Sequence, residues 1–257
     1  MASDAARWYE RAFDATYLEC YEQFEQEPVW QMDCDFIQGQ LELKPGDTAL
    51  DLCCGAGRHC LEFARRGLQV TGLDISSSMI DVARARAASL EKSSAERLTW
   101  ECRDAVALDH EKKFDAVYNY LTSFGHCDDE GNRAILRNVH RALRPGGKLL
   151  LEMINMVWLL GNFVPTERRV YPNFTYVERR RYDPISGRIT THRERVVAGE
   201  NPQVLEPFTV RAYLPCDLRS MLEQTGFDNL SLVASPTGQS FQTFSTPRLA
   251  FVARRPL

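Results

Sequence analysis

The stretch Thr48–Gly57 constrains the fold of this chain more than any other part of its sequence. It is an apolar run that ends in a Gly-x-Gly turn at Gly55 and Gly57, and the amphipathic segment 58–66 follows directly. This order predicts a buried strand, a tight loop and a helix. The glycines allow positive φ angles and a close approach of a ligand, and the start of the helix offers unpaired N–H groups. Such a junction is typical of a site for a nucleotide-like ligand.

Two ligand classes compete for this loop, dinucleotides and S-adenosylmethionine (SAM). The third glycine of the dinucleotide pattern is missing, because Cys60 occupies its place. Asp74 closes the next apolar run, where a strand end would present its carboxylate to ribose hydroxyls, as both ligands require. The dinucleotide pattern does not require Asp51, before the glycines, or Asp104, at the end of a further strand. These two acids favour SAM.

Five segments in register resemble the motifs of the class I SAM-dependent methyltransferases, and the resemblance covers roughly residues 48–153. It implies an α/β fold with a doubly wound, seven-stranded sheet that is mostly parallel, with the last strand antiparallel. One departure is Cys53, where the family more often has glycine, and we expect this small thiol to pack under the loop. The matching segments are Leu50–Gly57, Gly72–Asp74, Cys102–Ala105, Phe114–Asn119 and Leu143–Gly147.

The composition indicates which partners and which cellular compartment to expect. A net charge of −4 over 257 residues gives no reason to expect a nucleic-acid partner, and a small acceptor fits better. The eight cysteines form no Cys-x-x-Cys pair, so we expect free thiols in a reducing compartment and no metal site. With no signal-peptide core near the start and no run of about eighteen apolar residues, we expect a cytoplasmic protein without a membrane partner. The sequence makes no prediction of oligomeric state.

Three parts are expected along the chain. Residues 1–44, with aromatic residues at helical spacing, are expected to form an N-terminal helical cap. Residues 45–155 and 209–257 are expected to form the SAM-binding core, whose last two strands pair antiparallel. Residues 156–208 read as an inserted antiparallel β-sheet that covers the acceptor site, with a hairpin turn at Asp183–Gly187.

The resemblance also implies the cofactor contacts. The glycine loop lies against the methionine and ribose, Asp74 accepts hydrogen bonds from the ribose, and Asp104 accepts one from the adenine amino group. For Arg58 and His59 a role at the methionine carboxylate and a solvated surface role are both open. The aromatic residues of the N-terminal helices, Phe13 among them, either close over the ligand or belong to a core stripe. The expected cofactor-binding residues are Asp51, Cys53, Gly55, Ala56, Gly57, Arg58, Asp74, Ile75, Met79, Arg103, Asp104, Ala105, Asn119, Tyr9, Tyr17 and Trp30.

The segment Tyr118–His126, Asn155 and the inserted sheet resemble the branch of glycine and aminosugar N-methyltransferases, which act on small amines or hydroxyls. Methyl transfer from a sulfonium is an in-line displacement, so the protein mainly positions the nucleophile and removes water. His126 is the leading candidate for a catalytic base, ahead of His192 and Tyr213, and its alternative role is that of a polar loop residue. The expected acceptor-binding residues are Tyr120, Ser123, Asn155, Arg181 and Tyr213.

Eight arginines lie between Val164 and Glu200. On alternating strand faces most of them are expected to be solvated, while one or two are candidates for binding an acceptor carboxylate or phosphate. The expected function is transfer of a methyl group from SAM to a nitrogen or oxygen of a small-molecule acceptor, with S-adenosylhomocysteine as product. The alternatives are a methyltransferase that acts on a macromolecule, a dinucleotide-dependent reductase and a non-catalytic SAM-binding module.

Overall fold

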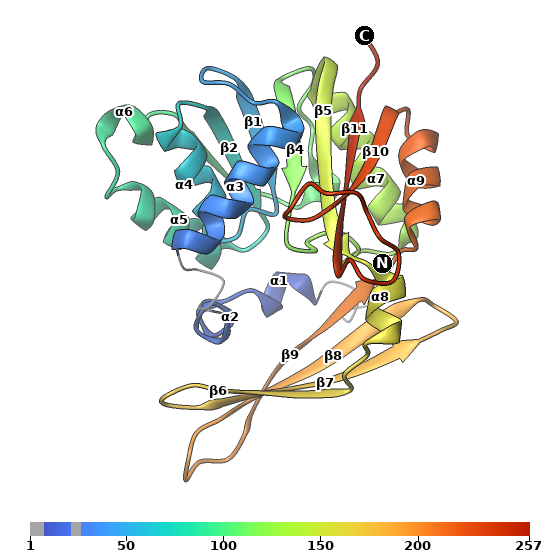
Figure 1. Ribbon diagram of the computed structural model, residues 1–257. Helices are drawn as coiled ribbons and strands as arrows, with labels where there is room; N and C mark the ends of the chain where they lie inside the picture. The colour runs from blue at the N-terminus through green and yellow to red at the C-terminus, as the bar shows by residue number, and fades with distance from the viewer. Residues whose placement is uncertain (1–7, 22–26) are drawn as a thin grey trace.

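The main body of the molecule is a seven-stranded sheet in the order β10-β11-β5-β4-β1-β2-β3 (Figure 1). The computed structural model describes residues 8–21 and 27–257. Strands β1 to β5 are parallel, and β11 runs antiparallel to both β5 and β10. The predicted doubly wound sheet with an antiparallel last strand is confirmed. The strands are β1 (Thr48–Leu52), β2 (Gln69–Asp74), β3 (Leu98–Cys102), β4 (Phe114–Asn119), β5 (Leu143–Ile154), β10 (Asp228–Ala234) and β11 (Arg248–Arg254).

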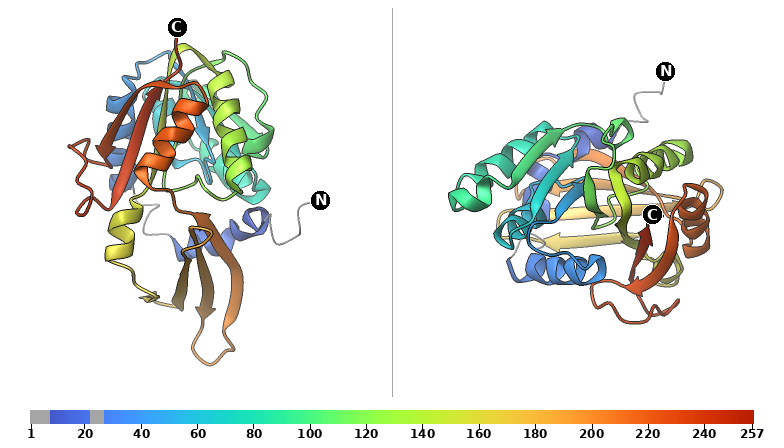
Figure 2. Two further views of the ribbon diagram at one scale, coloured as in Figure 1. Left: turned by 90° about the vertical axis from the view of Figure 1, so that its right-hand side faces the viewer. Right: turned by 90° about the horizontal axis from the view of Figure 1, so that it is seen from above.

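Helices cover both faces of this sheet (Figure 2). On one face α3 (Glu27–Leu41), α4 (Arg58–Arg65) and α5 (Ser77–Ala87) pack in a cluster that contains Ile37, Phe63 and Ile80. On the other face α7 (Asp129–Ala142) and α9 (Pro215–Gln224) bury a second cluster. The central strands are therefore buried on two sides, which explains their nearly continuous apolar sequences. The short α6 (Lys92–Ala95) and the 3₁₀ turn η3 (Ala105–Ala107) belong to the connections around β3.

Side-chain caps fix the start of two core helices, α5 and α7. The hydroxyl of Ser76 accepts a hydrogen bond from the backbone of Met79 at 3.3 Å and begins α5. The carboxylate of Asp128 accepts one from the backbone of Gly131 at 2.8 Å and begins α7. Both caps satisfy N–H groups that the first helical turn leaves unpaired. They also fix the loops at the carboxyl ends of β2 and β4, where the site lies.

A second, four-stranded antiparallel sheet follows the core strand β5 and the helix α8 (Met156–Gly161) (Figure 2). The predicted hairpin turn joins β7 to β8, but the sequence prediction missed α8 and β9, and β9 continues beyond the expected boundary at residue 208. Pro207 obscures β9 in the sequence, because it lies where the β8–β9 ladder changes register and proline is tolerated at a bulge. The four strands are β6 (Thr166–Val170), β7 (Thr175–Asp183), β8 (Arg188–Val196) and β9 (Gln203–Arg211).

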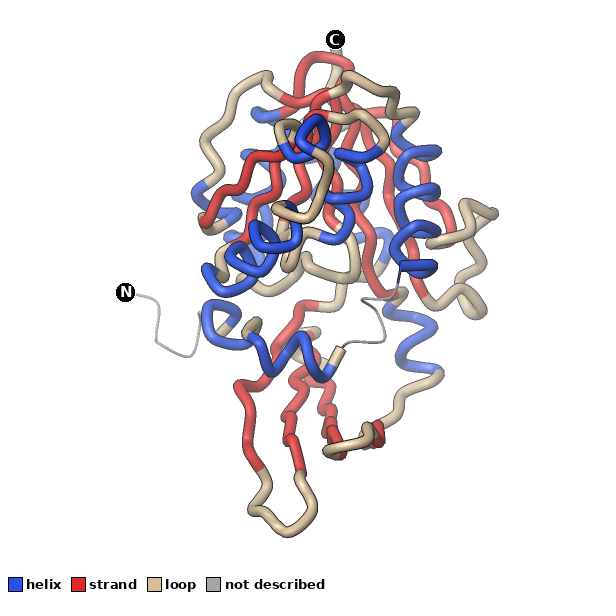
Figure 3. The backbone as a smooth tube through the Cα atoms, turned by 90° about the vertical axis from the view of Figure 1, so that its left-hand side faces the viewer, coloured by secondary structure: helices blue, strands red, loops and turns tan. Residues whose placement is uncertain are grey.

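The expected N-terminal cap lies in two places. Helix α3 packs with α4 and β5 on the core. The short helices α1 (Tyr9–Ala12) and α2 (Ala15–Cys20) lie between the core and the inserted sheet (Figure 3). Ion pairs attach them to that sheet, Arg11 to Glu206 at 2.9 Å and Arg195 to Glu19 at 3.0 Å. Residues 1–7 and 22–26 of the expected cap lie outside the described residues. None of the described helices is both long and apolar enough to cross a membrane.

Candidate active site

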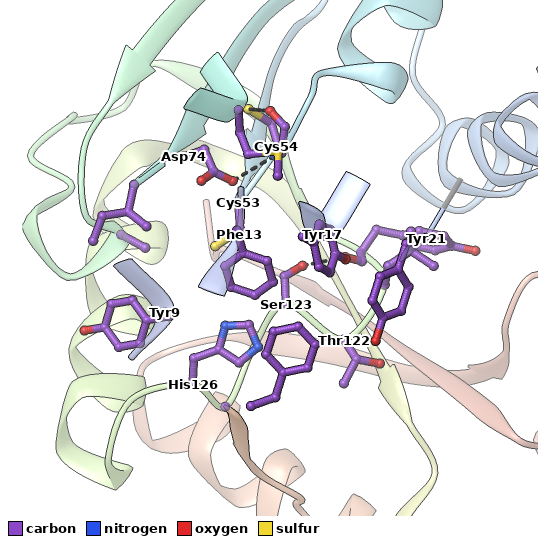
Figure 4. A pocket seen from close by; sticks show the side chains of 18 of the residues that line it. Tyr9, Phe13, Tyr17, Tyr21, Cys53, Cys54, Asp74, Thr122, Ser123 and His126 are labelled. Carbon is purple, nitrogen blue, oxygen red and sulfur yellow. Dashed lines mark hydrogen bonds between the residues drawn. The ribbon is translucent and has the colours of Figure 1, made fainter. Parts of the chain in front are cut away.

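A cavity of about 570 Å³ lies at the carboxyl ends of strands β1 to β5 (Figure 4). Asp51, Asp74, Asp104, Tyr120 and Ile154 line it, one from the end of each of these strands. Helices α1 and α2 and the inserted sheet provide the opposite wall. Ligands of open α/β sheets bind at this edge, and sites for drug-sized ligands span roughly 300–1,000 Å³. The cavity therefore has the place and size of a ligand site.

Asp74 and the glycine loop form one hydrogen-bonded unit on the floor of the cavity. The Oδ2 atom of Asp74 accepts a hydrogen bond from the backbone of Gly55 at 2.8 Å, and Oδ1 accepts one from the backbone of Ser76 at 2.9 Å. Burial raises the pKa of Asp74, while these N–H donors favour its charged form. Gly55 has φ +53°, and a Cβ there would meet no atom within 4 Å. A ligand can thus approach the loop backbone closely at Gly55.

Gly57 and Cys53, both expected to bind the cofactor, differ in their surroundings. Gly57 is not part of the cavity wall; a Cβ there would lie 2.5 Å from the Trp100 ring and 2.9 Å from Ala83, so glycine serves the packing of the loop. Cys53 borders the cavity rather than lying wholly under the loop, and its φ is +66°. This left-handed conformation favours glycine and explains why the family more often has one.

Cys60, which replaces the third glycine of the dinucleotide pattern, supports Asp51. Its thiol donates a hydrogen bond to Oδ2 of Asp51 at 3.2 Å. Asp51 is buried at the end of β1, and this burial raises its pKa. Burial also raises the pKa of the Cys54 thiol to about 11, so this neighbour of the loop stays protonated.

In the described ranges 8–21 and 27–257, no group of His, Cys, Asp or Glu side chains is arranged to hold a metal ion.

The expected adenine end of the cavity is formed by the loops after β2 and β3. The carboxylate of Asp104 accepts a hydrogen bond from the backbone of Val106 at 3.0 Å, which fixes the turn after β3. Met79 is buried at the start of α5. The expected cofactor residues that line this end are Ile75, Met79, Arg103, Asp104 and Ala105, and Ala56 and Arg58 line the cavity beside the glycine loop.

An aromatic wall faces the glycine loop across the cavity (Figure 4). Its members come from α1, α2 and the segment between them, from β9, and from the loop after β4. The ring of Phe13 stacks on Phe208 at 5.4 Å and on His126 at 5.6 Å. Burial, with a smaller contribution from Arg188, lowers the pKa of His126 to about 4, so its imidazole is uncharged at neutral pH. The wall consists of Tyr9, Phe13, Tyr17, Phe208 and His126.

The inserted sheet places charged groups on the roof of the cavity. Glu178 is 3% exposed, accepts a hydrogen bond from the Tyr21 hydroxyl at 2.6 Å and pairs with Arg169 at 2.9 Å. Arg180 pairs with both Glu178 and Glu167. These two arginines and two glutamates line the cavity and balance in charge.

Three residues expected to bind the acceptor lie outside the cavity lining. Arg181 follows Arg180 in β7 and, because side chains alternate across a strand, lies on the opposite face. Tyr213 donates a hydrogen bond to Asp129 at 2.8 Å and packs in the core beneath α7. Asn155 caps α8 and donates hydrogen bonds to the backbone of residues 243 and 246. The other two, Tyr120 and Ser123, line the cavity.

Besides Gly57, two residues expected to bind the cofactor, Asn119 and Trp30, lie outside the cavity lining. The amide of Asn119 donates a hydrogen bond to the backbone of Leu52 at 2.7 Å and ties the end of β4 to the end of β1. Trp30 belongs to α3 and does not contribute to the cavity lining. His192, the second candidate base, is exposed on β8 and is also absent from the lining.

A partly buried ion pair between Glu152 and Arg248 lies beside the loop after β4 and was not predicted from the sequence. Leu121 and Thr122 have φ angles of +60° and +58°, which are unfavourable for residues with a side chain. The backbone N–H of Thr122 donates to Oε2 of Glu152 at 3.1 Å, and Glu152 is fully buried and pairs with Arg248. A single acid inside the apolar strand Leu149–Met153 was the available signal, since buried charges are normally paired.

Comparisons with known proteins agree with this geometry. Residues 49–147 match the family described as "Methyltransferase domain". The chain is 34% identical over 119 residues to 27-O-demethylrifamycin SV methyltransferase of Amycolatopsis mediterranei, covering 46% of this chain and 42% of that one. It is 34% identical over 121 residues to ubiquinone biosynthesis O-methyltransferase of Xanthomonas oryzae pv. oryzae, covering 47% and 48%. The match thus spans less than half the length of each relative.

Solved structures match over nearly the whole chain. The CcbJ methyltransferase from Streptomyces caelestis superposes with a TM-score of 0.81 at 18% identity, over 99% of this chain and 100% of that one. CalS10, an amino pentose methyltransferase from Micromonospora echinaspora, gives 0.68 at 21% identity, over 93% and 96%. Residues 49–147 therefore match a methyltransferase domain, and the chain shares the α/β fold of these methyltransferase structures.

Proposed function

We propose that this protein binds SAM in the cavity and transfers its methyl group to a nitrogen or oxygen of a small-molecule acceptor. The observation that carries this proposal is the joined unit of Asp74 and Gly55 on the cavity floor. A carboxylate has about four lone-pair sites, so both oxygens of Asp74 keep acceptor capacity for ribose hydroxyls after binding two backbone N–H groups. Ile75 and Met79 then flank the adenine, and Asp104 accepts from its amino group.

The aromatic wall suits the reacting part of the cofactor. A sulfonium carries a positive charge, and aromatic faces attract cations within about 6 Å. His126 within this wall is uncharged at neutral pH, so it does not repel that cation. The wall also keeps water from the methyl group, which favours the displacement over side reactions.

The enclosure of the cavity favours a small acceptor over a macromolecule. Helices α1 and α2 and the inserted sheet cover the carboxyl edge, which an uncovered parallel sheet leaves open. The roof is charged but balanced, and this suits a polar acceptor with amino or hydroxyl groups. Similar structures include a sugar N-methyltransferase, KedS8 from Streptoalloteichus sp., at 18% identity, whereas the sequence relatives include O-methyltransferases. Both kinds of acceptor atom therefore belong in the proposal.

His126 is our candidate for the group that receives the acceptor's proton. Its imidazole is available as a base above a pH of about 4, but its low pKa makes it a weak one. An acceptor that reaches the cavity as a neutral amine needs no base before attack. A hydroxyl acceptor would depend on His126 more strongly.

The test is formation of S-adenosylhomocysteine from SAM with a panel of amino sugars, small amines and hydroxylated aromatic compounds. Mass spectrometry of the product distinguishes N- from O-methylation. We expect turnover with at least one member of the panel. Tight binding of SAM without transfer to any compound would favour a non-catalytic binding module, and binding of NADH in place of SAM would favour a reductase.

A further inference from the structure

Arg248 occupies a fixed position at the edge of the cavity and is not among the proposed cofactor contacts. It is the first residue of β11 and lies opposite Ile154, the last residue of β5. The amide of Asn155 holds the preceding loop by donating to the backbone oxygens of Thr243 at 2.7 Å and Thr246 at 2.8 Å. The side chain of Arg248 therefore enters the cavity wall from a rigid base.

The guanidinium of Arg248 is only partly satisfied by the protein. Its Nε donates to Oε1 of Glu152, whose other oxygen already accepts from the backbone of Thr122 at 3.1 Å. The Tyr120 ring lies 5.4 Å from its Cζ. Among the residues that the structure describes, Nη2 finds no hydrogen-bond partner although it is shielded from solvent. A buried donor without an acceptor is costly, so the protein alone leaves this guanidinium incompletely satisfied.

The two arginines on the roof of the cavity each pair with two carboxylates, although Nε of Arg169 is likewise buried without a hydrogen-bond partner among the described residues. Arg169 and Arg180 share two glutamates on the roof, and the Arg169 guanidinium also lies 4.8 Å from the Tyr21 ring and 4.9 Å from the Tyr176 ring. Arg248 has a single carboxylate partner that it shares with a backbone N–H. Its side chain is 29% exposed while that of Glu152 is wholly buried, so the accessible part of the pair borders the cavity.

We propose that Arg248 is the carboxylate-binding residue of this cavity. A guanidinium binds carboxylate oxygens through paired N–H groups, and Glu152 holds the plane of this one through Nε. The carboxylate belongs either to the methionine part of SAM or to an acid group of the acceptor. This inference rests on the proposed function, because it assigns a ligand group within the same cavity.

The test is calorimetric titration of Arg248→Lys and of the double variant Arg248→Gln/Glu152→Gln. The double variant removes both charges and so avoids leaving a buried unpaired acid. Arg181→Gln, outside the cavity lining, is the matched control. The probes are S-adenosylhomocysteine, 5′-methylthioadenosine, which lacks the amino-acid part, and acetate added to protein already loaded with S-adenosylhomocysteine.

If the carboxylate is that of the methionine, the double variant should bind S-adenosylhomocysteine at least tenfold more weakly than the wild type. Its affinity for methylthioadenosine should be unchanged. The affinity of Arg248→Lys for S-adenosylhomocysteine should lie between those of the wild type and the double variant. If it belongs to the acceptor, binding of both nucleosides should stay constant while acetate binding to the loaded protein is lost. Wild-type affinities for all three probes in the folded variants would overturn the inference and leave the proposed function intact. Failure of the wild type to bind either nucleoside would instead reject the proposed function, and acetate titration of the unloaded protein would then test Arg248 alone.

Discussion

The carboxylate of Asp74 lies 2.8 Å from the backbone nitrogen of Gly55, and this hydrogen bond joins the end of β2 to the loop after β1. Ser76 extends the connection, because its N–H donates to Asp74 at 2.9 Å and its hydroxyl donates to the backbone of Phe13 at 2.7 Å. The proposed cofactor floor is thus fixed by the protein itself and linked directly to the segment between α1 and α2. Preorganisation of this kind reduces the conformational entropy that the loop loses when a ligand binds.

The two glycines of the loop should respond differently to alanine. Gly55→Ala should cost about 1–2 kcal/mol in the free energy of unfolding, from backbone strain alone, and should weaken S-adenosylhomocysteine binding because the new Cβ enters the cavity. Gly57→Ala should cost about 2–4 kcal/mol, since strain and overpacking against Trp100 add. Urea unfolding and calorimetry measure the two effects. Equal destabilisation by both changes would contradict the packing role of Gly57.

The buried acid on the roof should be important for stability. Glu178→Gln leaves Arg169 and Arg180 without their shared charge in a site where the acid is 3% exposed. We expect a loss of about 3–5 kcal/mol in the free energy of unfolding. Glu194→Gln is the matched control, because Glu194 pairs with the half-exposed Arg179 at 2.7 Å and should contribute less than about 1 kcal/mol. Similar losses in both variants would contradict the difference in burial.

His126 should make stability depend on pH. Its pKa is about 4 in the folded protein against 6.5 for the ordinary group, so the unfolded chain binds more protons between these values. The free energy of unfolding should therefore rise with pH from about 4 to 6.5, by up to about 3 kcal/mol from this residue. His126→Gln should remove that part of the rise in urea titrations across this range. An unchanged pH profile in the variant would show that burial does not perturb the imidazole.

The segment with α1 and α2 should be needed for transfer but not for folding of the core. Deleting residues 1–26 removes both helices and leaves α3, which packs on α4 and β5. We expect loss of methyl transfer to any acceptor found, because the cavity would open to water, with a cooperative thermal transition retained. Full activity of the shortened protein would contradict the proposal that α1 and α2 enclose the cavity.

The core fold was predictable because its signals are local. The strand, glycine turn and helix at 48–66, and the acids that end successive strands, fix a parallel sheet with a site at its carboxyl edge. Ser76 and Asp128, which cap α5 and α7, are short polar residues of the kind that favour helix starts. Most of the expected cofactor residues close to these motifs line the cavity.

The acceptor side depends on contacts between distant segments. Arg181 and Arg180 are neighbours in sequence, and only the packing of the sheet decides that Arg180 borders the cavity. Asn155 follows β5 as expected of a site residue. Its amide, however, donates hydrogen bonds to the backbone of the loop before β11 and not to the cavity. Arg248 reaches the site through an antiparallel strand nearly 100 residues after Glu152. No local period in the sequence encodes such a pairing.

The most direct test of the central claim is calorimetric titration of S-adenosylhomocysteine into the wild-type protein and into Asp74→Ala, with Asp81→Ala on the exposed side of α5 as control. We predict saturable binding at one site in the wild type and in the control. The Asp74 variant should lose about 1.5–3 kcal/mol of binding free energy, roughly ten- to a hundred-fold in affinity, because it lacks the ribose acceptor and the anchor of the glycine loop. An affinity in Asp74→Ala equal to that of the wild type, or no binding by the wild type, would contradict the account.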